Sequence, residues 1–429
     1  MTDARQAALT VLLRVERENA YSNLTLSGET QLSEQDRALC YAIVLSVLER
    51  KLTLDYLLSQ HLRQPIRKLE PTVHTVLRMG AAQILFMDRI PVSAAVNESV
   101  KLVKKNGGAY AAGLVNAVLR KVASTGLRLP EDDGRDETRS VLYSYPVDAA
   151  GALRLCYGAQ TAGEIMASSL EKHPVYVRRN TLSGKALPKG FTPAAWPEAC
   201  FAASPDVFSD EDGALRAGAC HVQDRASQLL CSVAGARPGM RVIDVCAAPG
   251  GKTMTLAQHM RNEGQIVACD IHDHRLALIR QNAERLGVAI VQTLRRNAEE
   301  PDDLPPGDLV LCDVPCSGIG DAGAKPEVKY KPYAAVEGLA ELQKRILSRS
   351  ARLVRPGGRL IYSTCSLYRA ENADVVSAFL GENQSFHAVP VAVPDESAVF
   401  RDDCGVTVLP GKGQCDGLFF CVMERDRNG

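Results

Sequence analysis

The sequence predicts a two-part protein, in which an all-α segment precedes a Rossmann-like α/β domain with a mainly parallel sheet. Apolar residues recur at helical spacing from the N-terminus to residue 128, as in amphipathic helices. From residue 236 onward, short apolar strands alternate with helical stretches, which is typical of a parallel sheet covered by helices. A strand, a Gly-Gly turn and a helix start at residues 244–253 organise this second part.

Length and composition are those of a soluble globular chain with two or three domains. The 429 residues are 46% apolar and 23% charged, as in ordinary globular proteins. No apolar run approaches the roughly 18 residues of a membrane-spanning helix, and residues 1–5 do not open a signal peptide. We therefore expect a cytoplasmic protein with no membrane partner.

The thirteen cysteines form no regular disulfide framework. Many lie inside apolar strands, so we expect reduced thiols that serve as small core residues. Cys312 and Cys316 are four residues apart, without a matching second pair or a nearby histidine. This spacing argues against a zinc site, and we expect no bound metal.

The first 128 residues predict a compact bundle of helices. Pro91 and the Gly107-Gly108 pair interrupt the helical pattern, as residues that end helices do. Ser33 and Ser93 stand where N-caps are expected. The apolar residues recur around positions 8–15, 33–48, 54–58, 73–85, 93–105 and 114–122.

A basic surface is expected on the last two of these helices. Lys101, Lys104 and Lys105 share one helix face, and Arg120 follows on the next helix. The whole chain has a net charge of zero, but residues 1–128 carry +6. A positive excess confined to one segment points to nucleic acid, although a solvated helical surface explains it almost as well.

Three stretches of the first segment resemble the NusB-like RNA-binding helical domain. They are residues 89–91 (RIP), 96–100 (VNESV) and 113–120 (GLVNAVLR). The resemblance implies that residues 1–128 bind RNA, with the three lysines and Arg120 as candidate contacts.

The stretch between the two parts predicts a linker and a middle segment. Residues 130–137 are acidic and contain Gly and Pro, so we expect residues 129–145 to be a linker. Residues 146–235 are expected to form a middle α/β segment with a strand near residues 175–178, leading into the domain at residues 236–429.

The turn after the first strand of the second domain predicts a cofactor site. Gly250 and Gly251 stand between an apolar, β-branched strand and a helix, and bare N–H groups at such a helix start can face a ligand. Asp270 ends the next strand, 19 residues beyond Gly251. A carboxylate there can accept hydrogen bonds from ribose hydroxyls, which predicts an adenosine-containing cofactor.

A P-loop is the competing interpretation of this turn. Gly251-Lys252-Thr253 resembles the end of that motif, but the motif would need glycine where Cys246 stands. A nucleoside triphosphatase is therefore disfavoured. A tight turn without a ligand is the other alternative, and the acidic end of the neighbouring strand argues against it.

Two further loops follow strands at the same edge of the expected sheet. Asp313 closes one strand and begins the sequence DVPCSG, which contains Cys316. Cys365 follows another strand. Ligands in such sheets bind outside the carboxyl ends of the strands, so we expect Gly250, Asp270, Asp313 and Cys365 along one edge.

Two cysteines and a carboxylate near an adenosine cofactor suit methylation of a pyrimidine at C5. A thiolate that adds to C6 makes C5 enamine-like, while an acid near N3 quenches the developing negative charge. After methyl transfer, a base removes the C5 proton and the thiolate leaves. Either cysteine alone could be a core residue, and the chemistry by itself does not choose between Cys316 and Cys365 as nucleophile.

Four motifs resemble the RNA cytosine-5 methyltransferases of the NOL1/NOP2/Sun class: residues 244–253, 313–318, 363–366 and 416–420. With its NusB-like start, the whole chain resembles the bacterial Sun/Fmu group of 16S ribosomal RNA methyltransferases. The resemblance implies a Rossmann-like domain dependent on S-adenosyl-L-methionine that forms 5-methylcytosine in 16S ribosomal RNA.

The same resemblance assigns roles to individual residues. Cys365 would attack C6, Cys316 would assist product release, and Lys329 would lie beside the target base. Asn297 stands where the family usually has an aspartate at the adenine amino group, and its amide oxygen can accept that bond without charge assistance. The remaining cofactor contacts would be Cys246, Ala247, Ala248, Pro249, Gly250, Gly251, Lys252, Asp270 and Asp313.

Two rival functions remain at this point. The same chemistry could act on transfer RNA or 23S ribosomal RNA. The chain could also be a non-catalytic, NusB-like RNA-binding factor, although the paired cysteines and the intact Gly loop argue against that. We expect a monomer.

Overall fold

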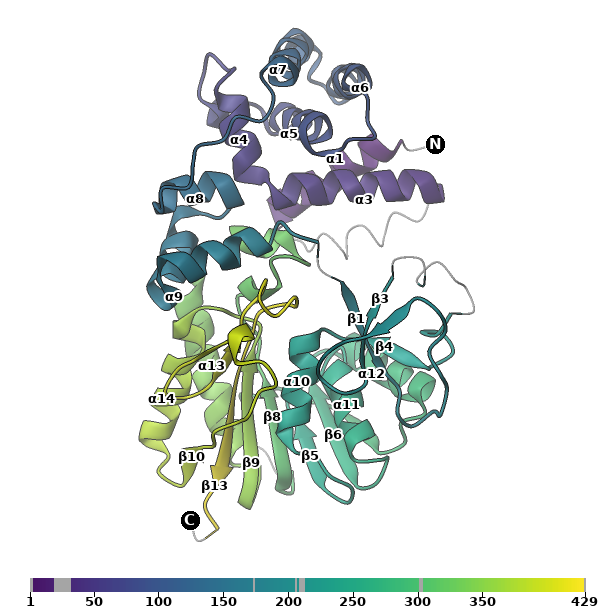
Figure 1. The fold of residues 1–429 in the computed structure, drawn as a ribbon, viewed down its shortest axis with the longest axis vertical. Helices are drawn as coiled ribbons and strands as arrows, with labels where there is room; N and C mark the ends of the chain where they lie inside the picture. The colour runs from purple at the N-terminus through teal and green to yellow at the C-terminus, as the bar shows by residue number, and fades with distance from the viewer. Residues whose placement is uncertain are drawn as a thin grey trace. The chain divides into compact units, whose positions relative to one another are not determined.

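The computed structural model describes residues 3–18, 32–172, 174–204, 207, 213–300 and 304–427. The chain forms two compact units (Figure 1). The first unit comprises Met1–Glu171 and Ala322–Lys331, and the second comprises Lys172–Asp321 and Pro332–Gly429.

The described part of the first unit is helical, as the sequence predicts. Two of its helices begin with side-chain caps, because Ser33 accepts a hydrogen bond from the N–H of Asp36 and Glu70 accepts one from that of Val73. The elements are α1 (Ala4–Glu18), α3 (Glu34–Glu49), α4 (Lys51–Ser59), η1 (Ile66–Lys68), α5 (Pro71–Phe86), α6 (Val92–Lys105), η2 (Ala109–Ala111), α7 (Ala112–Thr125), α8 (Asp136–Tyr143), α9 (Val147–Ser168) and η5 (Pro326–Tyr330).

Helix α5 is the centre of this bundle. It packs against α1, α3, α4, α6 and α7, and Val76 and Leu77 in its middle are fully buried. Gly80 lets α7 come close, since a Cβ at this position would lie 2.5 Å from Leu119 Cδ1. An apolar helix surrounded by others in this way is a core helix rather than a surface one.

The first unit extends beyond the expected boundary at residue 128. Helix α8 lies within the stretch expected to be a linker, and Thr53 of α4 donates a 2.6 Å hydrogen bond to the carbonyl of Val141 in α8. Helix α9, expected to lead into the second domain, also belongs to the first unit. The boundary between the units in this region lies between Glu171 and Lys172.

A short segment from late in the sequence completes the first unit. Ala322–Lys331 follows a strand of the second unit in sequence, yet it packs with the N-terminal helices. The hydroxyl of Tyr330 donates to the carbonyl of Leu48 at 2.6 Å and lies 2.8 Å from Ser144 Oγ.

The second unit contains a nine-stranded sheet with the strand order β11-β12-β13-β9-β8-β5-β6-β7, in which β10 pairs with β13. Strands β7, β6, β5, β8 and β9 are parallel, and β13 is antiparallel to β9. The strands are β5 (Arg241–Asp244), β6 (Gln265–Asp270), β7 (Val291–Arg295), β8 (Gly307–Asp313), β9 (Val354–Thr364), β10 (Phe386–Ala388), β11 (Val399–Arg401), β12 (Val406–Val408) and β13 (Leu418–Arg425).

Helices cover both faces of this sheet, because successive strand residues point to opposite sides. Val242 packs in one apolar core with α10, α11 and α12. Ile243, the next residue, packs in another core with α13 and α14. The helices are α10 (Arg225–Ala234), α11 (Gly251–His259), α12 (Asp273–Leu286), α13 (Ala335–Ala351) and α14 (Ala373–Glu382), with short turns η4 (Ile319–Asp321), η6 (Arg369–Glu371) and η7 (Glu396–Ala398).

The direction of winding reverses at β5. The chain proceeds from β5 to β6 and β7 on one side, and then returns to place β8 on the other side of β5 (Figure 1). In open α/β sheets the ligand crevice lies at such a switch point, outside the carboxyl ends of the strands. The fold therefore predicts a ligand site at the loops after β5, β6, β8 and β9.

A small antiparallel sheet, ordered β2-β3-β1-β4, precedes the large one in the same unit. It contains the strand expected at residues 175–178, and Arg178 donates a 3.0 Å hydrogen bond to Gln258 of α11. The small sheet thereby supports the helix that begins at the Gly turn. Its strands are β1 (Val175–Arg179), β2 (Phe191–Pro193), β3 (Cys200–Ala203) and β4 (Cys220–Val222).

One local expectation differs from the structure. The sequence PGG at residues 356–358 predicts a turn before a strand at residues 359–363, but β9 runs through it as one strand. The pairing with β8 shifts there, from Gly307–Val354 to Leu309–Arg359, so the extra residues form an irregularity within the strand.

Among the described helices, none is both long and apolar enough to cross a membrane.

Candidate active site

The Gly loop lies at the carboxyl end of β5, as the sequence predicts. Its backbone bonds to both neighbouring strands, since the N–H of Val245 donates to Leu311 and that of Ala247 donates to Cys269. Gly250 has φ 103°, a conformation that side chains other than glycine rarely adopt. Helix α11 begins at Gly251, so its first N–H groups are available at this edge.

One buried acceptor beside this loop suits a ligand with hydrogen-bond donors. Asp244 Oδ2 accepts from Thr253 at 2.7 Å, whereas Oδ1 is buried without a well-formed partner among the described residues. Burial raises the pKa of Asp244 to about 7, against the opposing effect of Thr253. A buried acceptor left unsatisfied is costly, and an adenosine cofactor with hydroxyl and amino groups fits this end of the strand.

Asp270 lies at the end of β6, where a ribose-binding carboxylate is expected. Its side chain is only 5% exposed. One oxygen accepts from the N–H of His272 at 3.0 Å, and the other lies 3.5 Å from Arg275 Nη1. The second distance is long for a hydrogen bond, so this oxygen retains capacity for a further donor.

An ion pair joins three segments at the same edge. Lys252 of α11 donates to Asp313 Oδ2 at 2.7 Å, and Ser363 of β9 donates to Asp313 Oδ1 at 2.7 Å. Burial by itself would lower the pKa of Lys252, but the charge and hydrogen bond of Asp313 outweigh it and raise the pKa. The pair therefore keeps a charged ammonium beside the loop that carries Cys316.

The two cysteine loops converge. Cys316 Sγ and Cys365 Sγ lie 3.2 Å apart, although 49 residues separate them in sequence. The hydrogen bond with Cys316, burial and the negative charges of Asp321 and Asp313 all raise the pKa of Cys365. The thiol form of Cys365 is thus favoured until a proton acceptor or a substrate changes its surroundings.

Asn297 follows β7 at the carboxyl edge, but its amide is engaged locally. Its oxygen accepts from the N–H of Glu299 at 3.1 Å, and its nitrogen donates to Glu300 at 3.3 Å. The oxygen can still accept a second bond from an adenine amino group. The adenine contact stays a prediction.

Lys329 belongs to the segment that packs within the first unit. Its side chain is fully buried, and its ammonium nitrogen donates to the carbonyls of Glu49 at 2.7 Å and Tyr143 at 3.3 Å. Burial lowers its pKa to about 7. The expected contact with the target base stays a prediction, and it would require Lys329 to leave these two carbonyls.

The expected RNA-binding residues are exposed on α6 and α7. Lys101 forms an ion pair with Glu98 at 2.7 Å, and Arg120 donates to Asn116 at 3.1 Å. Between these helices, Tyr110 of η2 is 77% exposed. Sequence reasoning did not single out this tyrosine, although its place after Gly107-Gly108 and beside the lysines could have drawn attention to it.

Sequence reasoning also missed a buried carboxylate next to the cysteine loops. Glu371 is fully buried and accepts hydrogen bonds from Ser317 and Ser366. The available signal was that each cysteine is followed directly by a serine. A side chain able to bind both serines would lie between the two loops.

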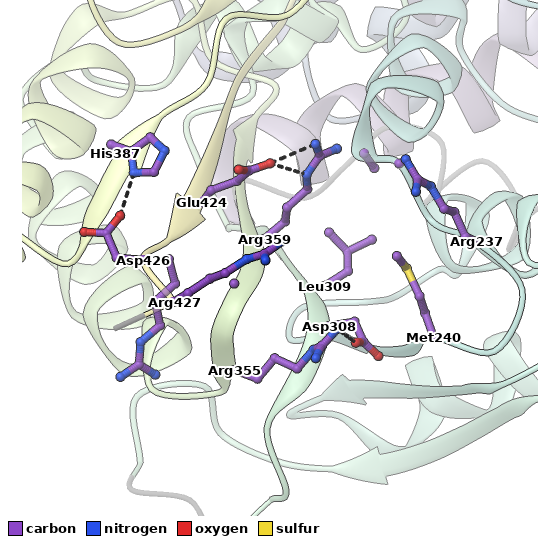
Figure 2. Close-up of a pocket in the computed structure, with 14 residues that line it drawn as sticks. Arg237, Met240, Asp308, Leu309, Arg355, Arg359, His387, Glu424, Asp426 and Arg427 are labelled. Atoms are coloured by element: carbon purple, nitrogen blue, oxygen red, sulfur yellow. Dashed lines mark hydrogen bonds and ion pairs between the residues drawn. The ribbon is translucent and has the colours of Figure 1, made fainter. Parts of the chain in front are cut away.

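A cavity of about 340 Å³ lies at the opposite, amino end of the parallel strands (Figure 2). Asp308 at the start of β8 and Arg355 of β9 are among its lining residues. Its three acidic residues each have a basic partner, in the pairs Asp308–Arg355, Glu424–Arg359 and Asp426–His387. Since each of these carboxylates already has a partner and the cysteines are at the other edge, we assign the chemistry to the carboxyl edge.

Comparison with known proteins identifies the family. Residues 233–424 match the model described as 16S rRNA methyltransferase RsmB/F, and residues 2–124 match the NusB family. A Bacillus subtilis protein named probable ribosomal RNA small subunit methyltransferase B is 32% identical over 448 residues, covering 99% of each chain. The chain belongs to the RsmB family of ribosomal RNA small subunit methyltransferases. The resemblance stated from its motifs is confirmed.

Solved structures resemble this RsmB-family chain in fold. The crystal structure of PH0851 has a TM-score of 0.80 at 22% identity and covers 98% of both chains. A methyltransferase homolog protein from Pyrococcus horikoshii has a TM-score of 0.58 at 25% identity, over 69% of this chain and 100% of that one. The expected fold class, a NusB-like helical domain followed by a Rossmann-like methyltransferase domain, is confirmed.

Proposed function

We propose that the second unit uses S-adenosylmethionine to methylate C5 of a cytosine in 16S ribosomal RNA. The observation that carries this proposal is the 3.2 Å approach of Cys316 Sγ and Cys365 Sγ at the sheet edge that also carries the Gly loop. Family membership supports methyl transfer to ribosomal RNA. The paired thiols favour the cytosine-5 reaction over direct methylation of a nitrogen or a ribose hydroxyl, which needs no nucleophilic thiol.

The cofactor-binding role is proposed for the Gly loop and its neighbours. The first N–H groups of α11, which begins at Gly251, are available at the carboxyl edge, where the start of a helix favours a carboxylate. Asp270 would accept from the ribose hydroxyls and Asn297 from the adenine amino group. S-adenosylmethionine, when bound, supplies an electrophilic methyl group.

Cys365 is proposed as the nucleophile. Its thiolate would form a bond to C6 of the cytosine and make C5 nucleophilic enough to accept a methyl group. After transfer, the C5 proton must leave as the bond between C6 and Cys365 breaks. Cys316, 3.2 Å from the attacking sulfur, is positioned to assist this second half of the cycle.

Asp313 is proposed to bind the base as well as the cofactor edge. Its two oxygens accept hydrogen bonds from Lys252 and Ser363, and each can accept one more. The exocyclic amino group of cytosine is a matching donor. Lys252, the charged donor of this pair, would then take the place of the acid expected near N3.

RNA affinity is proposed to come from the first unit. Lys101, Lys104, Lys105 and Arg120 are suited to phosphate contacts, and the exposed ring of Tyr110 is suited to stacking on an unpaired base. These contacts would hold ribosomal RNA while the second unit carries out the chemistry.

The two cysteine roles predict different outcomes on alanine substitution. Cys365→Ala should give neither methylated RNA nor a covalent adduct, because no bond to C6 can form. Cys316→Ala should transfer the methyl group and then stall, so that methylated RNA stays attached to Cys365. The adduct should appear as a slowly migrating band on a denaturing gel and should require S-adenosylmethionine.

Matched controls make this test decisive. Cys312→Ala removes a buried cysteine of the same strand-end region and should turn over without an adduct. An adduct that survives in Cys365→Ala and vanishes in Cys316→Ala would exchange the two roles. Bisulfite sequencing of 16S and 23S ribosomal RNA and of transfer RNA after the reaction identifies the substrate, and methylation of either alternative alone would refute the 16S assignment.

A further inference from the structure

A fully buried carboxylate links the two loops that carry the cysteines. Glu371, at the end of η6, is 0% exposed. Its Oε1 accepts from the backbone N–H of Ser317 at 2.8 Å, and its Oε2 accepts from the hydroxyl of Ser317 at 2.6 Å. The same Oε2 accepts from the hydroxyl of Ser366 at 2.5 Å. Ser317 directly follows Cys316, and Ser366 directly follows Cys365.

The carboxylate is held in turn by the helix behind it. Gln343 of α13 donates to Glu371 Oε1 at 3.0 Å and to the carbonyl of Pro315, also at 3.0 Å. The buried hydroxyl of Tyr362 donates to the backbone carbonyl of Glu371 at 2.6 Å. The position of Glu371 is therefore fixed by groups outside the two cysteine loops.

The residue after Glu371 fixes the second loop independently. Asn372 donates to the carbonyl of Ser366 at 2.9 Å and accepts from the hydroxyl of Thr364 at 2.6 Å. Thr364 and Ser366 flank Cys365 on either side. Of Glu371 and Asn372, only Glu371 also binds the loop that contains Cys316.

The four hydrogen bonds to Glu371 depend on its two side-chain oxygens. Alanine at this position removes both oxygens, so all four bonds are lost and the buried N–H of Ser317 loses its acceptor. Glutamine would not have this effect, because its amide oxygen can accept from the two N–H donors while its amide nitrogen donates to the serine hydroxyls, which can accept as well as donate. With alanine, the hydrogen bond from Gly320 to Cys365 remains, so the loops shift without separating, and a displacement of about 1 Å at reacting groups can cost about 100-fold in rate.

We propose that Glu371 is a positioning residue that sets the distance between Cys316 and Cys365 by binding the serine after each of them. The geometric part of this proposal rests on the hydrogen bonds alone. Its consequence for catalysis rests on the proposed function, in which Cys365 attacks the base and Cys316 acts on the same centre.

The first test measures geometry without requiring the methyltransferase reaction. Diamide oxidises two neighbouring thiols to a disulfide and takes up their hydrogens, so the rate of Cys316–Cys365 cross-linking reports how often the sulfurs meet. Peptide mass mapping identifies the cross-link among the other cysteines. Glu371→Ala in the full chain should slow this cross-link at least tenfold, whereas Glu382→Ala, at the exposed end of α14, should match the native protein.

The second test measures catalysis. Glu371→Ala should lower kcat for methyl transfer about 100-fold, while the Kd for S-adenosylhomocysteine changes less than twofold, because the Gly loop and Asp270 do not bind Glu371. Ser366→Ala, which removes one of the links but keeps the carboxylate, should show a smaller loss of both cross-linking and kcat. It also carries the test if Glu371→Ala fails to fold.

The outcomes separate this proposal from the proposed function. A lower melting temperature with native cross-linking rates in Glu371→Ala and Ser366→Ala would mean that Glu371 only stabilises the fold, and would overturn the positioning role. Slowed cross-linking in a protein whose native form methylates no RNA would leave the positioning role intact and refute the proposed function instead.

Discussion

Two lysines show how a neighbouring group decides the charge of a side chain. Lys329 is fully buried and Lys252 is partly buried, and loss of water contact favours the neutral amine in each. Lys252 faces the carboxylate of Asp313, which raises its pKa above the ordinary value. Lys329 instead donates to two backbone carbonyls, whose dipoles are weaker than a full charge, and its pKa falls to about 7.

The lowered pKa of Lys329 predicts a pH dependence of stability. Between pH 7 and about 10 the unfolded chain binds a proton that the folded chain has lost, so the free energy of unfolding should rise with pH. The slope contributed by one group is at most about 1.4 kcal/mol per pH unit. Urea titrations of the native protein and of Lys329→Met across this pH range measure this contribution, as the difference between the pH slopes of their free energies of unfolding.

A matched control for this measurement is Lys68→Met, which removes an exposed lysine of the same unit. Lys68→Met should keep the native slope, and Lys329→Met should lose part of it. Equal slopes in all three proteins would mean that Lys329 keeps its proton in the folded state.

At the scale of elements, three strand-end loops are joined through one glycine. The N–H of Gly320 donates to the carbonyl of Cys365 at 2.9 Å, and the N–H of Gly417 donates to the carbonyl of Gly320 at 2.9 Å. A Cβ at Gly320 would lie 2.3 Å from the oxygen of Gly417 and 2.8 Å from that of Cys365. Only a residue without a side chain allows these backbones to approach so closely.

Gly320→Ala should therefore separate the loops. We expect the second unit to lose about 1–3 kcal/mol of stability, the usual cost of overpacking, and methyl transfer to slow because the peptide of Cys365 moves. Chemical denaturation and single-turnover kinetics measure the two effects.

Gly338→Ala is the matched control for this substitution. Gly338 lies in helix α13 with open space around the position of a Cβ, so alanine there should raise stability by about 0.5–1 kcal/mol. Native stability and rate in Gly320→Ala would contradict the close packing of the three loops.

Local patterns predicted the elements of the sheet but not the contacts between distant loops. The strands that end at Asp244, Asp270 and Asp313 are apolar runs followed by an acidic residue, a pattern that is visible in the sequence. Glu371 is different, because a glutamate near the start of a helix usually faces solvent. Its burial follows from serines 54 and 5 residues away, and no local pattern encodes that pairing.

At the scale of the whole molecule, the sequence indicated the two kinds of fold but not how the chain divides between them. The shift from helical to alternating patterns marks where the sheet begins. The return of Ala322–Lys331 to the first unit is a contact between segments far apart in sequence. No local pattern in residues 326–330 (PEVKY) encodes this contact.

RNA binding should depend on salt through the lysines and not through Tyr110. Each lost phosphate contact, as in Lys104→Ala or Arg120→Ala, should reduce the slope of log affinity against log salt concentration by about 0.7–0.9. Tyr110→Ala should weaken binding by about 1–3 kcal/mol at an unchanged slope. Filter binding or fluorescence anisotropy over a range of salt concentrations separates the two effects.

Point variants suit this experiment better than removal of residues 1–128. That deletion would strip Lys329 and Tyr330 of their partners in α3 and leave a buried segment exposed. Lys189→Ala, at an exposed position of the second unit, should leave both affinity and slope unchanged. An unchanged slope in all the lysine and arginine variants would remove the RNA-binding role from α6 and α7.

The return of Ala322–Lys331 to the N-terminal helices also sets an order of events during protein synthesis. A ribosome adds about 5–20 residues per second, so residues 172–321 separate Glu171 from the completing segment by roughly 8–30 s. During that interval Lys329 and Tyr330 have not yet been synthesised, so the carbonyls of Glu49 and Leu48 lack these hydrogen-bond donors. The N-terminal helices, which leave the ribosome first, therefore complete their packing only after the Gly loop and strands β6 and β8 have emerged.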